Sequence, residues 1–126
     1  MGVKALHIAL PVIDMGTAVS FYTELFGLNV TSIGDEYTHL YYGPHRVSLI
    51  KTTPCSPSIQ TGGAERKRSR HFGFHVESAD EADAFATKLV KMGVKIVSGP
   101  ENRGKERTLF FVDPSGNQVE IYYEKS

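Results

Sequence analysis

The segments His7-Ile-Ala-Leu-Pro-Val12 and His71-Phe-Gly-Phe-His-Val76 are two copies of one pattern, 64 residues apart in a chain of 126 residues. Each opens with a histidine and continues mainly with apolar side chains, as a β-strand does. The apolar positions of the helical stretches that follow match at the same offset: Ala18, Phe21 and Leu25 correspond to Ala82, Phe85 and Leu89. The sequence therefore contains an internal repeat, and we expect both copies to fold in the same way.

Each predicted helix has recognisable signals at its ends. The first is expected to begin after Asp14 and to end at Gly27, a residue type that adopts the left-handed conformation readily. The second is expected to begin after Ser78, which forms a capping box with Glu81, and to end at Gly93. Short runs after the helices predict strands at residues 29–32, 37–42, 47–52, 95–98, 108–112 and 118–123. The predicted order is βαβββ, twice.

We therefore predict an α+β fold in which one domain, residues 1–126, consists of two tandem βαβββ modules with curved mixed sheets around a cavity. Module one covers residues 1–53 and module two covers residues 70–126. The linker, residues 54–69, is rich in proline and glycine, which do not continue a strand or a helix. The basic run from Arg66 to Arg70 either is a solvated connector or supplies an arginine that binds an anionic substrate.

Composition excludes several classes of protein. Fourteen Lys and Arg balance fourteen Asp and Glu, so the chain lacks the excess positive charge that nucleic-acid-binding proteins use. No apolar run approaches the roughly 18 residues of a membrane span. The single cysteine, Cys55, cannot form an internal disulfide or a cysteine-based zinc site, and no signal-peptide pattern opens the chain. We expect a cytoplasmic protein with no nucleic-acid or membrane partner.

The repeated histidines are expected on the sheet faces that point away from the helices. Because strand side chains alternate, His7, His71 and His75 point away from the apolar residues that contact the helices. Their small Ala and Gly neighbours leave room for a cavity on that face.

The last strands of the two copies align Ser48 with Glu120. If an approximate two-fold axis relates the copies, then His7, His71 and Glu120 surround one centre. Two imidazoles and one carboxylate are ligands that suit one divalent ion of iron, manganese, zinc or nickel. Hydrogen-bonded histidines with a structural role are the alternative interpretation.

Four further side chains are candidates for a substrate pocket. His75 lies four residues, about 13 Å, along the strand from His71, too far to bind the same ion, so it either orients a ligand or is structural. Ser48 and Tyr122 are assigned to the same cavity. Arg107 falls in the predicted loop before the seventh strand, where it either binds a substrate carboxylate or is solvated.

Six motifs occur in order along nearly the whole chain: His7-Ile-Ala-Leu, Phe21-Tyr22, Leu25-Phe-Gly-Leu28, His71-Phe-Gly-Phe, Phe111-Val-Asp-Pro-Ser-Gly-Asn117 and Val119-Glu120. Together they resemble the vicinal oxygen chelate superfamily, which includes glyoxalase I, extradiol dioxygenases, fosfomycin-resistance proteins and bleomycin-binding proteins. The resemblance implies paired βαβββ modules that enclose a metal-binding cavity, commonly in a homodimer. It also implies metal ligands at His7, His71 and Glu120.

The resemblance does not single out one reaction. Ser48 stands where glyoxalase I has a carboxylate, Ala9 where similar fosfomycin thiol transferases have threonine, and Phe110 where extradiol dioxygenases have a tyrosine. His39 precedes Ser48 by the interval seen for the acid–base histidine of extradiol dioxygenases. The predicted catalytic residues are therefore Glu120 and His39, because imidazole gains and loses a proton near neutral pH. A strand histidine hydrogen-bonded to a neighbour is the alternative for His39.

We predict a divalent-metal-dependent enzyme of glyoxalase or extradiol-dioxygenase type, that is, a lyase, an isomerase or a dioxygenase. It would chelate a small substrate through adjacent oxygens and stabilise an oxyanion or enolate. The alternatives are a fosfomycin-type thiol transferase and a metal-free, bleomycin-type protein that sequesters a ligand. A homodimer is expected, because two small curved sheets leave apolar edges that pairing would cover.

Overall fold

The computed structural model describes residues 2–52 and 71–125. The predicted linker, Cys55 and the basic run from Arg66 to Arg70 lie outside the described residues. The chain divides into two compact units, residues 1–59 (unit 1) and residues 60–126 (unit 2), each of which is described by itself.

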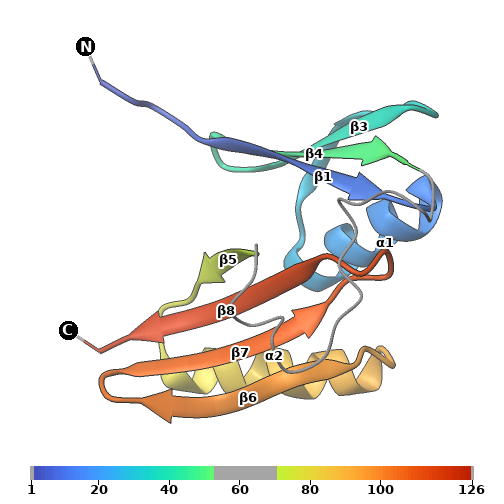
Figure 1. Cartoon of the computed structure of the whole chain (residues 1–126). Helices are drawn as coiled ribbons and strands as arrows, with labels where there is room; N and C mark the ends of the chain where they lie inside the picture. The colour runs from blue at the N-terminus through green and yellow to red at the C-terminus, as the bar shows by residue number, and fades with distance from the viewer. Residues whose placement is uncertain (1, 53–70, 126) are drawn as a thin grey trace. The chain divides into compact units, whose positions relative to one another are not determined.

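Unit 1 contains one helix and a sheet of four strands (Figure 1). Its elements are β1 (His7–Val12), α1 (Met15–Phe26), β2 (Asn29–Ser32), β3 (Tyr37–Tyr42) and β4 (His45–Lys51). The strand order is β1-β4-β3-β2, with β1 parallel to β4 and the other neighbours antiparallel. The first strand of the unit therefore pairs with its last.

The core of unit 1 forms where α1 packs against β3 and β4. The helix begins after Asp14, whose carboxylate accepts a hydrogen bond from the Thr17 amide, and ends at Gly27, which has a φ of 67°. Both predicted ends are confirmed. The helix buries Ala18, Phe21, Tyr22 and Leu25, and the sheet contributes Leu10, Val12, Leu40, Val47 and Leu49.

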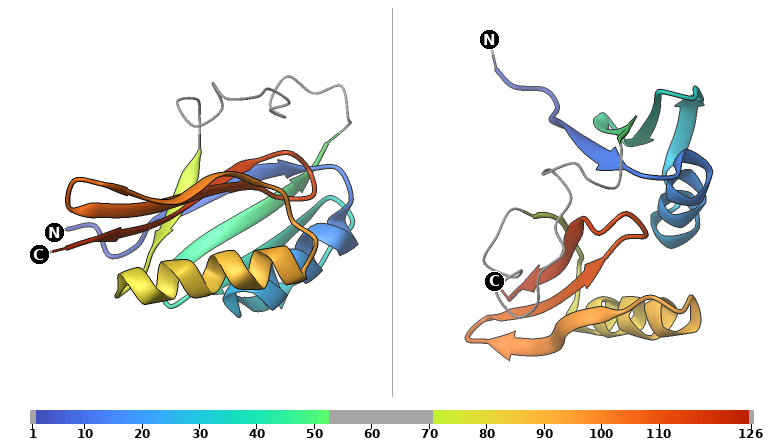
Figure 2. Two further views of the ribbon diagram at one scale, coloured as in Figure 1. Left: turned by 90° about the horizontal axis from the view of Figure 1, so that it is seen from below. Right: turned by 45° about the vertical axis from the view of Figure 1, so that its right-hand side comes forward.

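Unit 2 repeats this arrangement with β5 (Phe72–His75), α2 (Ala79–Lys91), β6 (Ile96–Arg103), β7 (Glu106–Val112) and β8 (Gln118–Glu124). Its strand order is β5-β8-β7-β6, and β5 is parallel to β8. Figure 2 shows α2 lying along one face of this sheet, where it contacts β6, β7 and β8. The buried contact residues include Ala82, Ala86, Leu89, Leu109, Phe111, Val119 and Ile121.

The predicted α+β fold with two tandem βαβββ modules is confirmed. The predicted boundaries of β2 and β3 are confirmed. Strands β6 and β7 are longer than predicted, because both continue as far as a two-residue turn at Gly104 and Lys105. Among the described residues, no helix has the length and apolar character needed to cross a membrane.

A turn held by one aspartate leads from β7 to β8. Asp113 is 3% exposed, and its carboxylate accepts hydrogen bonds from the backbone amides of Ser115 and Asn117, both at 2.9 Å. The Asn117 side-chain amide donates a third bond at 3.0 Å. Buried carboxylates need such partners. This turn therefore fixes the point at which β8, the strand that carries Glu120, enters the sheet.

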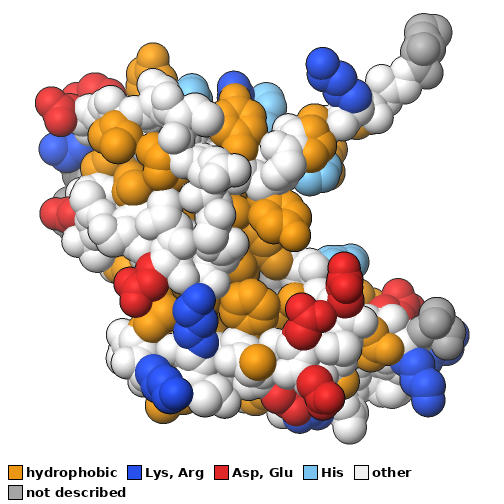
Figure 3. All heavy atoms as spheres, turned by 180° about the vertical axis from the view of Figure 1, so that it is seen from behind, with side chains coloured by type: hydrophobic (Ala, Val, Ile, Leu, Met, Phe, Trp, Pro, Cys, Tyr) orange, Lys and Arg blue, Asp and Glu red, His pale blue; other side chains and the backbone are white. Residues whose placement is uncertain are grey.

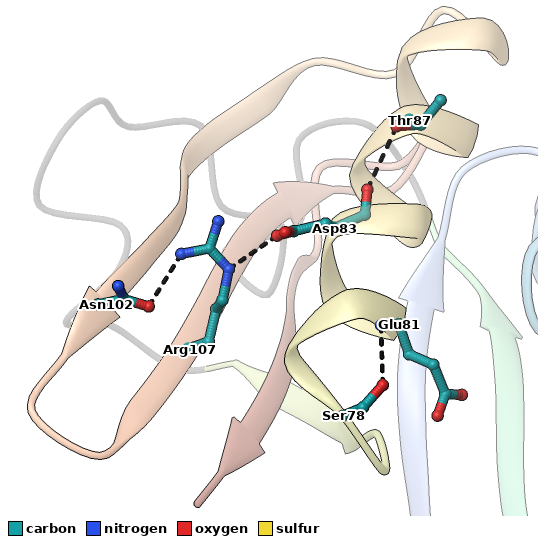
Figure 4. A network of polar contacts seen from close by, with 6 residues as sticks. All are labelled: Ser78, Glu81, Asp83, Thr87, Asn102 and Arg107. Carbon is teal, nitrogen blue, oxygen red and sulfur yellow. Dashed lines mark hydrogen bonds and ion pairs between the residues drawn. The ribbon is translucent and has the colours of Figure 1, made fainter.

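The start of α2 carries half of the predicted capping box. The Ser78 hydroxyl oxygen accepts a hydrogen bond from the Glu81 amide at 3.1 Å, which satisfies one of the open donors of the first turn. In Figure 4 a dashed line joins the Glu81 amide to Ser78 and none joins the Glu81 carboxylate to Ser78, so the reciprocal contact of the box is not made. The cap depends on Ser78 alone.

We expect Ser78→Ala to lower the free energy of unfolding by about 1 kcal/mol, because the Glu81 amide loses its acceptor. Urea unfolding followed by circular dichroism measures the change. Ser78→Asn is the control, since asparagine also caps helices and retains an acceptor. Equal stability of Ser78→Ala and the parent would contradict the assignment of Ser78 as the cap.

Candidate functional site

The two repeated histidines occupy equivalent register positions in their sheets. In unit 1, Ala9 lies opposite Ser48, and His7 is two residues before Ala9. In unit 2, Gly73 lies opposite Glu120, and His71 is two residues before Gly73. The alignment of Ser48 with Glu120 that the sequence predicts is thus reproduced in the strand pairing.

His71 and Glu120 form the candidate site in unit 2. The His71 Nε2 atom lies 3.3 Å from Glu120 Oε1, and both side chains are partly exposed, 30% and 17%. Two donors that each stand about 2.1 Å from one ion are themselves about 3.0 to 3.4 Å apart in octahedral or tetrahedral geometry. The spacing and the chemistry of this pair therefore fit a divalent metal ion.

Strand β7 supports both members of the pair. The Thr108 hydroxyl donates a 2.7 Å hydrogen bond to Glu120 Oε2. The Phe110 ring contacts the His71 ring edge-on, with centroids 5.2 Å apart. On the neighbouring strand β5, Gly73 leaves room for Glu120. A Cβ atom at Gly73 would lie 3.0 Å from the Glu120 carbonyl oxygen. The sequence analysis did not single out Thr108.

A second polar group lies farther along the same face. The Tyr122 hydroxyl donates a 2.9 Å hydrogen bond to Glu106 Oε2, and the His75 ring lies 4.6 Å from the Tyr122 ring. The bond to the Glu106 carboxylate, with lesser contributions from burial and from the charges of Glu106 and Glu124, raises the pKa of Tyr122 to about 12. The predicted pocket residues His75 and Tyr122 are therefore in contact with each other.

In unit 1, His39 and Ser48 are directly hydrogen-bonded. His39 Nδ1 lies 2.9 Å from Ser48 Oγ, and the two residues are register partners on adjacent strands. The Tyr37 ring lies 5.2 Å from the His39 ring. By alternation, His39 and Ser48 share the face that carries His7 and Ala9, opposite to α1.

His7 itself is exposed at the start of β1. Within residues 2–52 and 71–125, no three His, Cys, Asp or Glu side chains gather closely enough to hold a metal ion. The pair of His71 and Glu120 is thus the part of the predicted metal site that the structure brings together.

Arg107 does not lie where the sequence analysis expected it. It belongs to β7 and not to the loop before that strand. Its side chain points toward α2, where it forms an ion pair with Asp83 at 2.7 Å and a hydrogen bond with Asn102 at 2.9 Å (Figure 4). Thr108 on the same strand contacts Glu120, so alternation places Arg107 on the opposite face of the sheet. The structure does not bring Arg107 to the candidate site.

The face of β7 and β8 that carries the site is acidic. Strand alternation places three carboxylates on this face: Glu106, Glu120 and Glu124. Arg107, the basic residue of these two strands, lies on the other face. Figure 3, which views the molecule from behind, shows that carboxylates also gather on the opposite side of this unit. Glu106 was missed because the predicted strand began at Thr108, and the alternation of Glu106, Thr108 and Phe110 was the available signal.

Removing the Glu106 carboxylate is expected to lower the pKa of Tyr122 from about 12 toward the ordinary value of 10.0. The raised pKa means that this pair stabilises the folded chain fully below pH 10 and that the contribution is lost as the pH rises through about 12. Titration of ¹³C-labelled tyrosine by NMR in the parent and in Glu106→Ala measures the shift, with Tyr122→Phe to assign the signal. A parent midpoint near 10 would be the contrary result.

Both the sequence and the fold of this chain are similar to those of known proteins. The profile of the Glyoxalase/Bleomycin resistance protein/Dioxygenase superfamily matches residues 4–121. The metallothiol transferase FosB of Shouchella clausii is 29% identical over 124 residues, which cover 92% of this chain and 77% of that protein. The probable trivalent organoarsenical cleaving enzyme of Bacillus subtilis is 22% identical over 127 residues, 98% of this chain and 82% of that protein.

Solved structures share the fold. A glyoxalase/bleomycin resistance protein/dioxygenase from Alicyclobacillus acidocaldarius superposes with a TM-score of 0.75 at 19% identity, covering 98% of this chain and 92% of that chain. The fosfomycin resistance protein FosX from Listeria monocytogenes, complexed with Mn(II) and sulfate, has a TM-score of 0.75 at 16% identity, covering 98% and 90%.

Proposed function

Because the chain belongs to the glyoxalase/bleomycin resistance protein/dioxygenase superfamily, we propose that it is a divalent-metal-dependent enzyme that binds a small substrate through two adjacent oxygens. The 3.3 Å approach of His71 Nε2 to Glu120 Oε1 is the observation that carries the proposal. Relatives named as a metallothiol transferase and an organoarsenical cleaving enzyme support enzymatic activity. The Mn(II) complex of FosX supports a divalent ion.

The proposed ligands are His7, His71 and Glu120, a set that suits iron, manganese, zinc or nickel. His7 is included because it holds, beside β4, the register position that His71 holds beside β8. It would come from the same chain or from a second copy. The acidic face around Glu120 favours a cation. A bound ion would supply Lewis acidity, which stabilises negative charge on the substrate oxygens.

The chain's own residues would bind the substrate and move its protons. We assign proton transfer to His39, with Ser48 holding Nδ1 and thereby fixing the orientation of the imidazole ring. His75 and Tyr122 would contact the substrate on unit 2, since their rings are half-exposed or exposed and adjacent. The phenol stays protonated at neutral pH and so acts as a hydrogen-bonding group. Arg107 is left out because Asp83 holds it on the other face.

Metal binding is the direct test. The parent chain is expected to bind one Mn(II) per chain in a calorimetric titration. Because loss of an outer partner already weakens metal binding by roughly 10- to 100-fold, His7→Ala, His71→Ala and Glu120→Gln should each weaken it by more than about 100-fold. His45→Ala and Glu24→Gln are matched controls in unit 1, outside the proposed ligand set, and should bind as the parent does.

A parent chain that binds no divalent ion, even after reconstitution, would contradict the proposal and favour a metal-free protein that sequesters a ligand. Full affinity in His7→Ala alone would remove His7 from the ligand set while leaving the site on unit 2.

Thiol transfer is the second candidate, and the similarity to FosB over 92% of the chain favours it. Ser48 in place of a carboxylate argues against a lactoylglutathione lyase. Three assays separate the classes: oxygen uptake with catechol under Fe(II), loss of fosfomycin with a thiol under Mn(II), and isomerisation of the methylglyoxal–glutathione adduct under Ni(II).

In whichever assay shows turnover, we expect His39→Gln to lower kcat by about 10²- to 10⁴-fold while the Mn(II) affinity stays that of the parent, because His39 transfers a proton and does not bind the ion. Ser48→Ala, which frees Nδ1, should have a smaller effect on kcat. Parent-like turnover in His39→Gln would assign the histidine a structural role.

We also propose that the protein works as a homodimer. Each unit contains a complete sheet of its own, but both sheets have open edges. Every sheet has two edges, formed by β1 and β2 in unit 1 and by β5 and β6 in unit 2. Unit 1 also exposes the large apolar side chains Leu6, Tyr42 and Ile50. Such edges and side chains are typical of surfaces that associate. Sedimentation velocity measures the oligomeric state directly.

A further inference from the structure

We propose that Thr108 is a positioning residue for metal binding, which holds Glu120 so that one carboxylate oxygen is left for the ion. This inference rests on the proposed function, because it concerns how the chain presents one ligand of the proposed site. It assigns a role to a residue that no motif of the family resemblance contains.

The hydrogen-bond geometry divides the Glu120 carboxylate between two neighbours. Oε2 accepts the Thr108 hydroxyl at 2.7 Å, whereas Oε1 faces His71 Nε2 at 3.3 Å. A hydroxyl bond of this length to a carboxylate is a strong, charge-assisted contact. Oε1 is therefore the oxygen directed toward the proposed ion, and Glu120 would bind it through this single atom.

Thr108 is held firmly enough to impose this orientation. Its side chain is 1% exposed, and the branched Cβ restricts rotation about χ1. β7 is an inner strand, flanked by β6 and β8. On the β6 side, a Cβ atom added at Gly99 would lie 2.3 Å from the Thr108 carbonyl oxygen, so the β6 backbone approaches Thr108 closely. The donor that orients Glu120 is thus fixed by the backbone of its own sheet.

The Thr108 hydroxyl donates to a side-chain carboxylate and not to a backbone carbonyl. Thr23 and Thr87, in the helices, donate to backbone carbonyls four residues earlier, an acceptor that an extended strand does not offer. Thr108 instead bonds diagonally to Glu120, which is not its register partner, since Thr108 lies opposite Tyr122. A partner that orients a ligating carboxylate in this way typically contributes about 10- to 100-fold to metal affinity.

The test compares Mn(II) binding by calorimetry in the parent, Thr108→Val and Thr108→Ser. Thr108→Val keeps the shape and removes the donor, and we expect it to weaken binding by about 10- to 100-fold. Thr108→Ser keeps the donor and should stay within about 3-fold of the parent, as should the buried-threonine control Thr38→Val. The infrared carboxylate bands on metal binding should change in Thr108→Val and not in Thr108→Ser.

Each outcome bears on one claim. If the parent binds no Mn(II), the proposed function fails and this inference fails with it. If the parent binds and Thr108→Val binds equally, with unchanged carboxylate bands, the positioning role is overturned while the metal site stands. If Thr108→Val does not fold, Thr108→Cys replaces it, because a thiol is only a weak donor, and parent-like affinity in that variant would overturn the role.

Discussion

The parallel pairing of β5 with β8, in which Gly73 lies opposite Glu120, is the constraint on which the candidate site depends. The register sets which side chains share a face, because a shift of one residue would turn every side chain of β5 over. It places His71 beside the Glu120 carboxylate, and the absence of a side chain at Gly73 leaves room for the Glu120 carbonyl oxygen and Cβ. The same register places His75 against Tyr122. One strand pairing thus organises both polar groups of unit 2.

The duplicated fold shows how one architecture carries two different polar centres. β4 in unit 1 presents Ser48 at the position where β8 presents Glu120. Ser48 pairs with His39 through a hydrogen bond, whereas Glu120 pairs with His71 and takes its second contact from Thr108. The two centres differ at a second position as well, because the register partner of Ser48 is His39 whereas that of Glu120 is Phe110.

The sequence predicted the elements well because local signals determine them. Asp14 and Ser78 mark the helix starts, and the alternation of apolar residues marks the strands. The sequence also predicted that His71 and Glu120 surround one centre with His7, and the structure places His71 and Glu120 3.3 Å apart. Side-chain partners across strands were harder to predict. Arg107 was assigned to the pocket for its charge, but Asp83, on a helix 24 residues earlier, binds it on the other face.

Thr108 was not predicted because a threonine in a strand is ordinary, and only the diagonal geometry of paired strands reveals its acceptor.

The last strand of each unit completes its sheet, and this affects the order in which the two units can fold during synthesis. β5 is made early in its unit, but its neighbour β8 comes last in that unit, so this sheet cannot be completed until Glu124 has left the ribosome. The sheet of unit 1 needs only the first 51 residues. During synthesis, unit 1, which carries His39 and Ser48, can therefore fold before unit 2, which carries His71 and Glu120.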